Sequence, residues 1–234
     1  MRVSFVISPP FNASVSPICY RDELRYDAAM CNLYQQQRGP TEIAPLVQAL
    51  NRSGNLEPRD IYPDYDAPIV RNSATGRELV LARWGMPSPA FALKGKAVDK
   101  AITNIRNTSS PHWRRWLGID NRCLLPFDSF SEPGRSQDGK YQPVWFAFAD
   151  QRPAFFAGIW TSWTSIRKKA EGEVTCDLFG FLTTEPNAEV GAIHPKAMPV
   201  ILTTPDEWEA WLTAEWAEAR ALQRPLPDGD LSQH

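Results

Sequence analysis

Three side chains in this sequence could carry chemistry, although each is ordinary when taken singly. Cys31 directly follows Met30, Glu132 follows an aromatic-rich stretch at 127–131, and His194 precedes a proline. A thiol is a nucleophile, a carboxyl group in apolar surroundings has a raised pKa and can exchange protons, and an imidazole titrates near neutral pH. A fold that brings the three together would therefore combine one nucleophile with two acid–base groups.

The Met30-Cys31 pair predicts where the functional chain begins. An initiator methionine is removed when the following side chain is small, and Cys31 would then carry both a primary α-amine and a thiol. Both groups are nucleophilic near neutral pH, whereas a peptide bond from Met30 would turn the amine into an unreactive amide. We therefore expect residues 1–29 to be either an upstream misreading of the start codon or a segment removed before activity.

The first 29 residues do not read as a targeting segment. Their apolar run at 3–7 is cut by two prolines, which makes it shorter than the roughly 7 to 15 residues of a signal-peptide core. No apolar run of the chain reaches the roughly 20 residues that a membrane helix needs. We expect a cytoplasmic protein that does not enter a membrane.

Composition limits the possible partners. A formal net charge of -2 and a pI near 6.0 exclude a protein that is basic all over, so any contact with nucleic acid needs a local cluster of arginine and lysine. The four cysteines lack a Cys-x-x-Cys pair, and the chain has three histidines. These counts argue against a zinc ribbon, a redox motif or a histidine-rich metal centre, so we expect neither metal nor cofactor.

The elements that must position these side chains are mostly strands. Apolar and β-branched runs predict strands at 79–82, 122–125, 144–149, 154–160, 177–184 and 198–202. Apolar spacing predicts a helix from Thr41 to near Gly54, another from Ser110, and a third after the capping box at Thr204, whose apolar stripe runs to Trp216. Strands that do not alternate regularly with helices indicate an α+β fold around a mainly antiparallel, twisted or barrel-like sheet with peripheral helices. We expect one domain at 30–223 and a polar surface tail at 224–234.

Several short motifs occur in one order along this chain. They are Met30-Cys31, Trp84-Gly85, Asn104-Ile105-Arg106, Arg122-Cys123-Leu124-Leu125-Pro126, Glu132, Ile193-His194 and Met198-Pro199-Val200-Ile201-Leu202. In type and order they resemble the SOS response-associated peptidase (SRAP) family. The resemblance extends from Met30 to about Leu212.

The resemblance implies a function on damaged DNA. It implies an abasic-site sensor of peptidase or hydrolase type with lyase-like chemistry, which binds single-stranded DNA in a groove and crosslinks to the lesion through Cys31. The amine would form a Schiff base with the ring-opened sugar aldehyde, and the thiol would close a five-membered thiazolidine. Glu132 and His194 would move protons, and Asn104 would hold the sugar or the catalytic groups.

The chain also departs from the family pattern at three places. The family's Phe-Tyr-Glu-Trp reads Phe-Ser-Glu-Pro at 130–133, which keeps the carboxylate and loses its aromatic flanks. The segment from His194 to the Met-Pro pair is one residue longer than the common His-Asp-Arg-Met-Pro. The arginine that often stands two places after the cysteine is Leu33 here.

Basic and aromatic residues near the motifs are candidates for holding DNA. Phosphates would be neutralised by Arg106, Arg114, Arg115 and Lys196, and a base beside the lesion would stack on Trp84 or Trp113. Two other functions stay open: a cysteine-dependent peptidase and a non-covalent single-strand binder that has lost its chemistry. We expect a monomer whose partner is single-stranded DNA containing abasic sites.

Overall fold

The computed structural model describes residues 31–234, so the expectation for residues 1–29 lies outside it. The strands are β1 (Leu33–Gln36), β2 (Ala49–Asn51), β3 (Arg59–Ile61), β4 (Asp66–Ser73), β5 (Gly76–Trp84), β6 (Asn104–Ile105), β7 (Arg122–Phe127), β8 (Ser129–Arg135), β9 (Tyr141–Ala147), β10 (Ala154–Ile166), β11 (Glu173–Thr184), β12 (Met198–Pro199), β13 (Ile201–Leu202) and β14 (Ser232–Gln233). The helices are α1 (Pro40–Leu46), α2 (Ala90–Leu93), α3 (Pro111–Arg114), α4 (Ala188–Gly191), α5 (Pro205–Thr213) and α6 (Trp216–Ala219), with 3-10 turns at Ile119–Asn121 and Arg220–Leu222. Among these described helices, none has the length and apolar character to cross a bilayer.

Long strands at the centre of the molecule close into a barrel. β10 pairs with β7, β7 with β4, β4 with β5, β5 with β11, and β11 returns to β10. In this ring the β5–β11 pairing is parallel and the others are antiparallel. The predicted α+β fold with a mainly antiparallel, barrel-like core is therefore confirmed, and each predicted strand range overlaps an observed strand.

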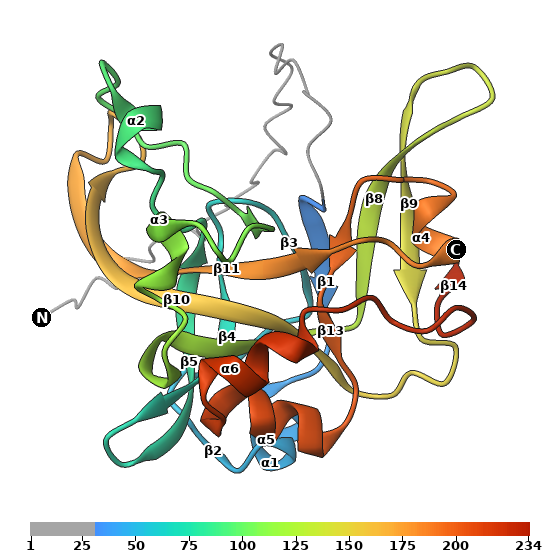
Figure 1. The fold of residues 1–234 in the computed structure, drawn as a ribbon, viewed down its shortest axis with the longest axis horizontal. Coiled ribbons are helices and arrows are strands. Elements are labelled where there is room, and N and C mark those ends of the chain that lie inside the picture. Colours follow the sequence, from blue (N-terminus) through green and yellow to red (C-terminus); the bar gives the residue numbers. More distant parts are fainter. Residues whose placement is uncertain (1–30) are drawn as a thin grey trace, which may run out of the picture.

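A second sheet packs against the barrel and carries the N-terminal part of the described chain. Its strand order is β14-β9-β8-β1-β3, and β8 begins directly after β7 with Asp128 between them. The fully buried Tyr34 of β1 meets the rings of Trp84 and Phe156 edge-on, with centroids 5.3 and 5.6 Å apart. These aromatic contacts attach β1 to the barrel, and Figure 1 shows β8 and β9 standing apart from the group formed by α1, α5 and α6.

The predicted helix after Thr204 is confirmed as α5, together with its cap. The Thr204 hydroxyl accepts from the Glu207 backbone N–H, and the Glu207 carboxylate accepts from the Thr204 backbone N–H. The buried Trp211 donates its indole N–H to the Cys123 carbonyl at 2.9 Å, which anchors the helix on β7. The apolar stripe was predicted too long, because α5 ends at Thr213 and Trp216 begins the separate helix α6.

The predicted helix between Thr41 and Gly54 is wrong in its second half. α1 ends at Leu46, and Ala49–Asn51 form β2, which runs parallel to β5. Pro45 has no backbone N–H to continue the helix, and Gln48 adopts a positive φ of 53° that lies outside the helical region. The helix predicted from Ser110 exists as α3, capped by the Ser110 hydroxyl, and is a single turn long.

The C-terminal segment is not the surface tail that its polar composition predicts. Leu226 and Leu231 are 4% and 6% exposed, and β14 pairs with β9 at the edge of the second sheet. Two buried leucines, the pairing of β14 with β9 and a hydrogen bond from the Ala188 N–H to Asp228 together attach the segment, although the leucines form no periodic pattern.

Candidate active site

Cys31 lies at the entry to β1, the strand held between β3 and β8. Its side chain is fully buried, and its thiol faces the Leu33 carbonyl oxygen at 3.6 Å. Because β1 is hydrogen-bonded along both edges, the strand fixes the position of the cysteine that precedes it.

Asn104 reaches Cys31 from the barrel. It begins β6, which runs parallel to β11 with Asn104 opposite Phe181. The side-chain amide donates to the Cys31 carbonyl at 3.1 Å and to the Thr103 hydroxyl at 2.9 Å. Its amide oxygen is buried and has no hydrogen-bond partner among residues 31–234, so it remains a free acceptor at the site. The sequence motif therefore holds the cysteine backbone directly.

Glu132 approaches the same cysteine from β8. Leu33 of β1 pairs with Ser131 of β8, which brings Glu132 beside the residues that precede β1. The carboxylate is 1% exposed, and the backbone N–H of Cys31 is close enough to act on its pKa. Burial raises the pKa of Glu132 above its ordinary value, although His194 and the Cys31 N–H act in the opposite direction. The prediction that desolvation raises this pKa is confirmed.

His194 completes the group from the turn after α4. The Asn187 side chain caps α4 by accepting from the Val190 N–H, and the His194 N–H donates to the Val190 carbonyl at 2.8 Å. The ring nitrogen Nδ1 lies 2.9 Å from Glu132 Oε2, and the two side chains are 6% and 1% exposed. Among the described residues nothing forms a hydrogen bond with Nε2 of the ring, so this nitrogen remains available to a ligand.

The thiol of Cys31 is not preset as a thiolate. Burial raises its pKa well above the ordinary value, and the charge of Glu132 raises it further. A buried thiol beside a carboxyl group is a neutral nucleophile that must lose its proton as it reacts. A carboxyl group of raised pKa, such as that of Glu132, can act both as acid and as base in such a transfer.

The two tryptophans predicted to stack on DNA are core residues. Trp84 has no exposed surface, and its indole N–H donates to the Thr103 carbonyl at 3.2 Å. Trp113 is 7% exposed and contacts His112 and Trp116. The prediction that they stack on a base is therefore wrong in this arrangement. Trp84 instead supports the site from behind, because Thr103 adjoins Asn104.

Close packing against Arg167 explains why a glycine stands in the Trp-Gly motif, although no sequence motif pointed to Arg167. Gly85 has a φ of +134°, and a Cβ there would meet Arg167 Nη2 at 2.4 Å and Ala101 at 2.6 Å. Arg167 is buried and donates to the Gly85 carbonyl at 2.9 Å. Thr103 and Asn32 were also missed; their side chains are 3.4 Å apart and join the Asn104 network to β1. Asn32 adjoins Cys31 and Thr103 adjoins Asn104, which was the available signal for these two; Arg167 adjoins no motif.

The predicted phosphate-binding residues do not gather in one place. Arg106 follows β6, is partly exposed, and pairs with Glu185 at 2.9 Å. Arg115 donates to the His112 carbonyl and lies over the Trp116 ring at 4.9 Å, which is a local packing role. Lys196 is exposed two residues after His194, and Arg114 lines a separate pocket beside α3. Arg106 and Lys196 are thus the basic residues nearest in sequence to the site.

Comparison with known proteins places this geometry in a family. Residues 30–234 match the family model for SOS response associated peptidase (SRAP). The chain is 30% identical over 200 residues to the abasic site processing protein YoqW of Bacillus subtilis (strain 168), covering 81% of this chain and 84% of that protein. It is 29% identical over 177 residues to YoaM of the same organism, covering 74% of each.

Solved structures agree on the fold. A protein from Bordetella bronchiseptica superposes with a TM-score of 0.67 at 27% identity, over 87% of this chain and 98% of the other. A protein from Bacteroides thetaiotaomicron reaches the same TM-score at 20% identity, over 87% and 91%, which shows a shared fold. The extent of the family match and the order of the motifs lead to one conclusion: this chain belongs to the SOS response associated peptidase (SRAP) family.

Proposed function

We propose that this protein recognises abasic sites in single-stranded DNA and joins them covalently through Cys31. Relatives across most of its length are named abasic site processing proteins, which supports a role in processing this lesion. The chemistry follows from the residues. An abasic deoxyribose opens to an aldehyde, and an N-terminal cysteine offers an amine and a thiol to the same carbon.

The reaction proceeds in two bond-forming steps. The unprotonated α-amine of Cys31 attacks the aldehyde carbon, and the resulting carbinolamine loses water to give an imine. Protonation of the departing hydroxyl requires an acid, and Glu132 or its partner His194 supplies that proton. The thiol sulfur then attacks the imine carbon while its proton passes to the nitrogen, which closes a five-membered thiazolidine. The sum is aldehyde plus aminothiol giving thiazolidine plus water.

One observation carries this proposal: the backbone of Cys31 lies against two motif side chains, Asn104 and Glu132. Asn104 donates to its carbonyl at 3.1 Å, and the buried Glu132 carboxyl group lies close enough to its nitrogen for that N–H to act on the carboxyl pKa. In a chain that begins at Cys31, that nitrogen is the reactive amine, already directed at the carboxyl group that exchanges protons with it. Such positioning removes the orientational cost of the first step.

The experiment is a comparison of two chains that differ in where they begin. The full chain of residues 1–234 and a chain starting at Met30 are expressed, and intact mass establishes each N-terminus. Each is mixed with abasic single-stranded DNA and resolved on a denaturing gel. We expect a heat-stable adduct whenever the mass shows Cys31 as the first residue.

The opposite result is equally clear. A full chain that retains residues 1–29 and still gives as much heat-stable adduct as the short chain contradicts the thiazolidine, because an amide nitrogen cannot form an imine. Binding of the short chain without any adduct supports the non-covalent single-strand binder instead. A peptidase has less support here, since its nucleophile needs a lowered thiol pKa and the pKa of Cys31 is raised.

A further inference from the structure

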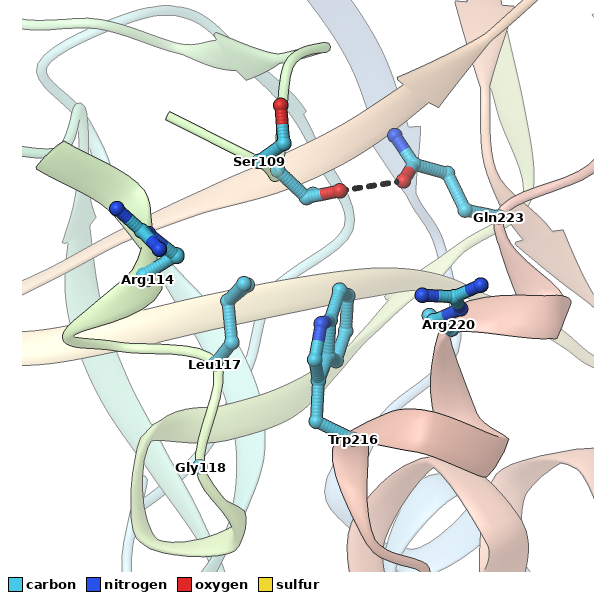
Figure 2. A pocket seen from close by; sticks show the side chains of 8 residues that line it. Ser109, Arg114, Leu117, Gly118, Trp216, Arg220 and Gln223 are labelled. Atoms are coloured by element: carbon cyan, nitrogen blue, oxygen red, sulfur yellow. Dashed lines mark hydrogen bonds between the residues drawn. The ribbon is translucent and has the colours of Figure 1, made fainter. Parts of the chain in front are cut away.

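A pocket of about 530 Å³ lies between α3 and the C-terminal helices, outside the Cys31 site. Figure 2 shows Arg114 on one side, Arg220 on the other, and the indole of Trp216 between them. In the described part of the chain neither guanidinium has an acidic partner or a side-chain hydrogen bond, whereas several other arginines are paired. Two unpaired cations facing one cavity indicate an anionic ligand.

The aromatic wall adds a second requirement to the ligand. Trp216 is partly buried, with one contact to the Trp211 ring at a centroid distance of 6.2 Å, and it also lines the pocket beside Leu117. An indole face next to two guanidiniums suits a planar base attached to a phosphate, because bases stack on aromatic rings while phosphates bind arginine. The volume is in the range of small-ligand sites, roughly 300 to 1,000 Å³.

The pocket is tied to the segment that carries the active-site asparagine. Gln223 accepts from the Thr108 hydroxyl at 2.9 Å and donates to the Arg106 carbonyl at 2.9 Å. Thr108 follows Asn104 by four residues, a reach of at most about 14 Å. A stacked strand advances about 3.4 Å per nucleotide, so this edge of the pocket lies within roughly four nucleotides of a lesion held at Asn104.

We infer that this pocket binds one nucleotide of the same DNA strand, a few positions from the abasic site. Arg114 and Arg220 hold its phosphate, and the base stacks on Trp216. This inference rests on the proposed function, which it extends by giving the protein a second contact with the strand. With this contact, the affinity depends on the length of the DNA strand. Part of the affinity does not require an abasic site.

The test uses lesion-free oligonucleotides, so that it does not depend on crosslinking. Binding of a 15-mer and a 4-mer of deoxythymidine is measured by fluorescence anisotropy across a salt series. We expect Arg220→Ala to weaken 15-mer binding several-fold and to reduce the salt slope by about 0.7, the value for one phosphate on a single strand. Trp216→Leu should weaken 15-mer binding by at least fivefold without changing the salt slope.

The control is Arg52→Ala, an exposed arginine beside β2, far along the chain from the pocket, whose 15-mer affinity should match wild type. A circular dichroism melt confirms that each variant folds. An Arg220→Ala protein that folds and keeps the wild-type affinity and salt slope overturns the inference, as does a wild-type protein that binds neither oligonucleotide. A wild-type protein that binds the 15-mer but forms no adduct with abasic DNA contradicts the proposed function and leaves the pocket supported if Arg220→Ala still weakens binding.

Discussion

In two charged clusters of this protein, the pKa values of the carboxyl groups are shifted in opposite directions. In the Arg83 cluster, Arg83 binds Asp64 at 2.7 Å and Glu171 at 2.8 Å, while Lys168 binds Asp64 at 2.9 Å. Burial acts to raise the pKa of Asp64, but hydrogen bonds from Arg83 and Lys168 outweigh it and hold this pKa below its ordinary value. The pKa of Glu171 is lowered by its hydrogen bond to Arg83.

In the Glu132–His194 pair the balance is reversed. Burial raises the pKa of Glu132 against the opposing effect of one imidazole and one backbone N–H. Each carboxylate of the Arg83 cluster meets an obligate cation, since arginine does not lose its proton in proteins, whereas the side chain that faces Glu132 is the imidazole of His194. Pairing with arginine and lysine therefore stabilises the charged form of Asp64 and Glu171, whereas burial favours the protonated form of Glu132.

The largest effect should come from removing the nucleophile beside the incompletely paired cluster. Cys31→Ala is expected to abolish the heat-stable adduct with abasic single-stranded DNA, because alanine has no sulfur to close the thiazolidine ring. Denaturing gels measure the yield. Cys123→Ala removes another fully buried thiol of raised pKa and should retain the adduct. An unchanged adduct yield from Cys31→Ala would contradict the assignment of Cys31 as the nucleophile.

The next effect should come from the carboxyl group that exchanges protons. Glu132→Gln is expected to slow adduct formation and its reversal by about 10²- to 10⁴-fold, the usual contribution of a general acid–base group, while DNA binding persists. His194→Ala should show a smaller defect of the same kind. Single-turnover gel kinetics measure both.

The matched control for this prediction is Glu171→Gln, a carboxyl group of the Arg83 cluster. Its rate should stay within about threefold of wild type, because its charge is fixed and it holds no mobile proton. A Glu132→Gln protein that reacts as fast as Glu171→Gln would remove the distinction between the two clusters.

The Arg83 cluster should respond in stability and not in rate. Arg83→Met is expected to lower the free energy of unfolding by about 2 to 3 kcal/mol, since it leaves partly buried charged hydrogen bonds unmade. Urea denaturation measures this. Arg77→Met on the same strand breaks a pair with the mostly exposed Glu209 and should cost less than about 1 kcal/mol. Equal losses in the two variants would mean that the Arg83 cluster contributes no more than a surface pair.

The smallest effect concerns the pH dependence of stability. Because the pKa of Glu132 is raised, the folded protein keeps a proton that the unfolded chain releases above the ordinary value of 4.5. The Glu132 contribution to stability is therefore fully present below pH 4.5 and is lost as pH rises through the raised pKa. Glu132→Gln cannot ionise, so its melting temperature should exceed that of wild type at pH 7, and the difference should shrink toward pH 4. If the melting temperature of the wild-type protein rises relative to that of Glu132→Gln between pH 4 and pH 7, the predicted sign is wrong.

The sequence predicted those secondary-structure elements that are determined by a local pattern of residues. The apolar runs of β10 and β11 and the capping box of α5 predicted their elements directly, because periodicity and capping are local properties. Motif order predicted Glu132, His194 and Asn104 as site residues; in the structure Asn104 donates to the Cys31 carbonyl, and His194 lies 2.9 Å from Glu132.

Sequence could not supply the long-range contacts. The Asn104 bond to the Cys31 carbonyl joins residues 73 apart, and only the closure of the barrel brings them together. The docking of Leu226 and Leu231 depends on a sheet edge that is built by distant strands. Trp84 was misassigned because an aromatic residue in a motif reads the same whether it touches DNA or supports the residue that does.

The position of Cys31 at the start of β1 also has a mechanical consequence. Any load on a strand of DNA attached to this cysteine would pass into β1 along its length. The ladders to β3 and β8 lie across that direction, so their hydrogen bonds share the load at once and cannot open one after another as in a peeling edge strand. A motor that meets the attached protein on DNA would therefore pull against the whole of β1, an inner strand of the second sheet.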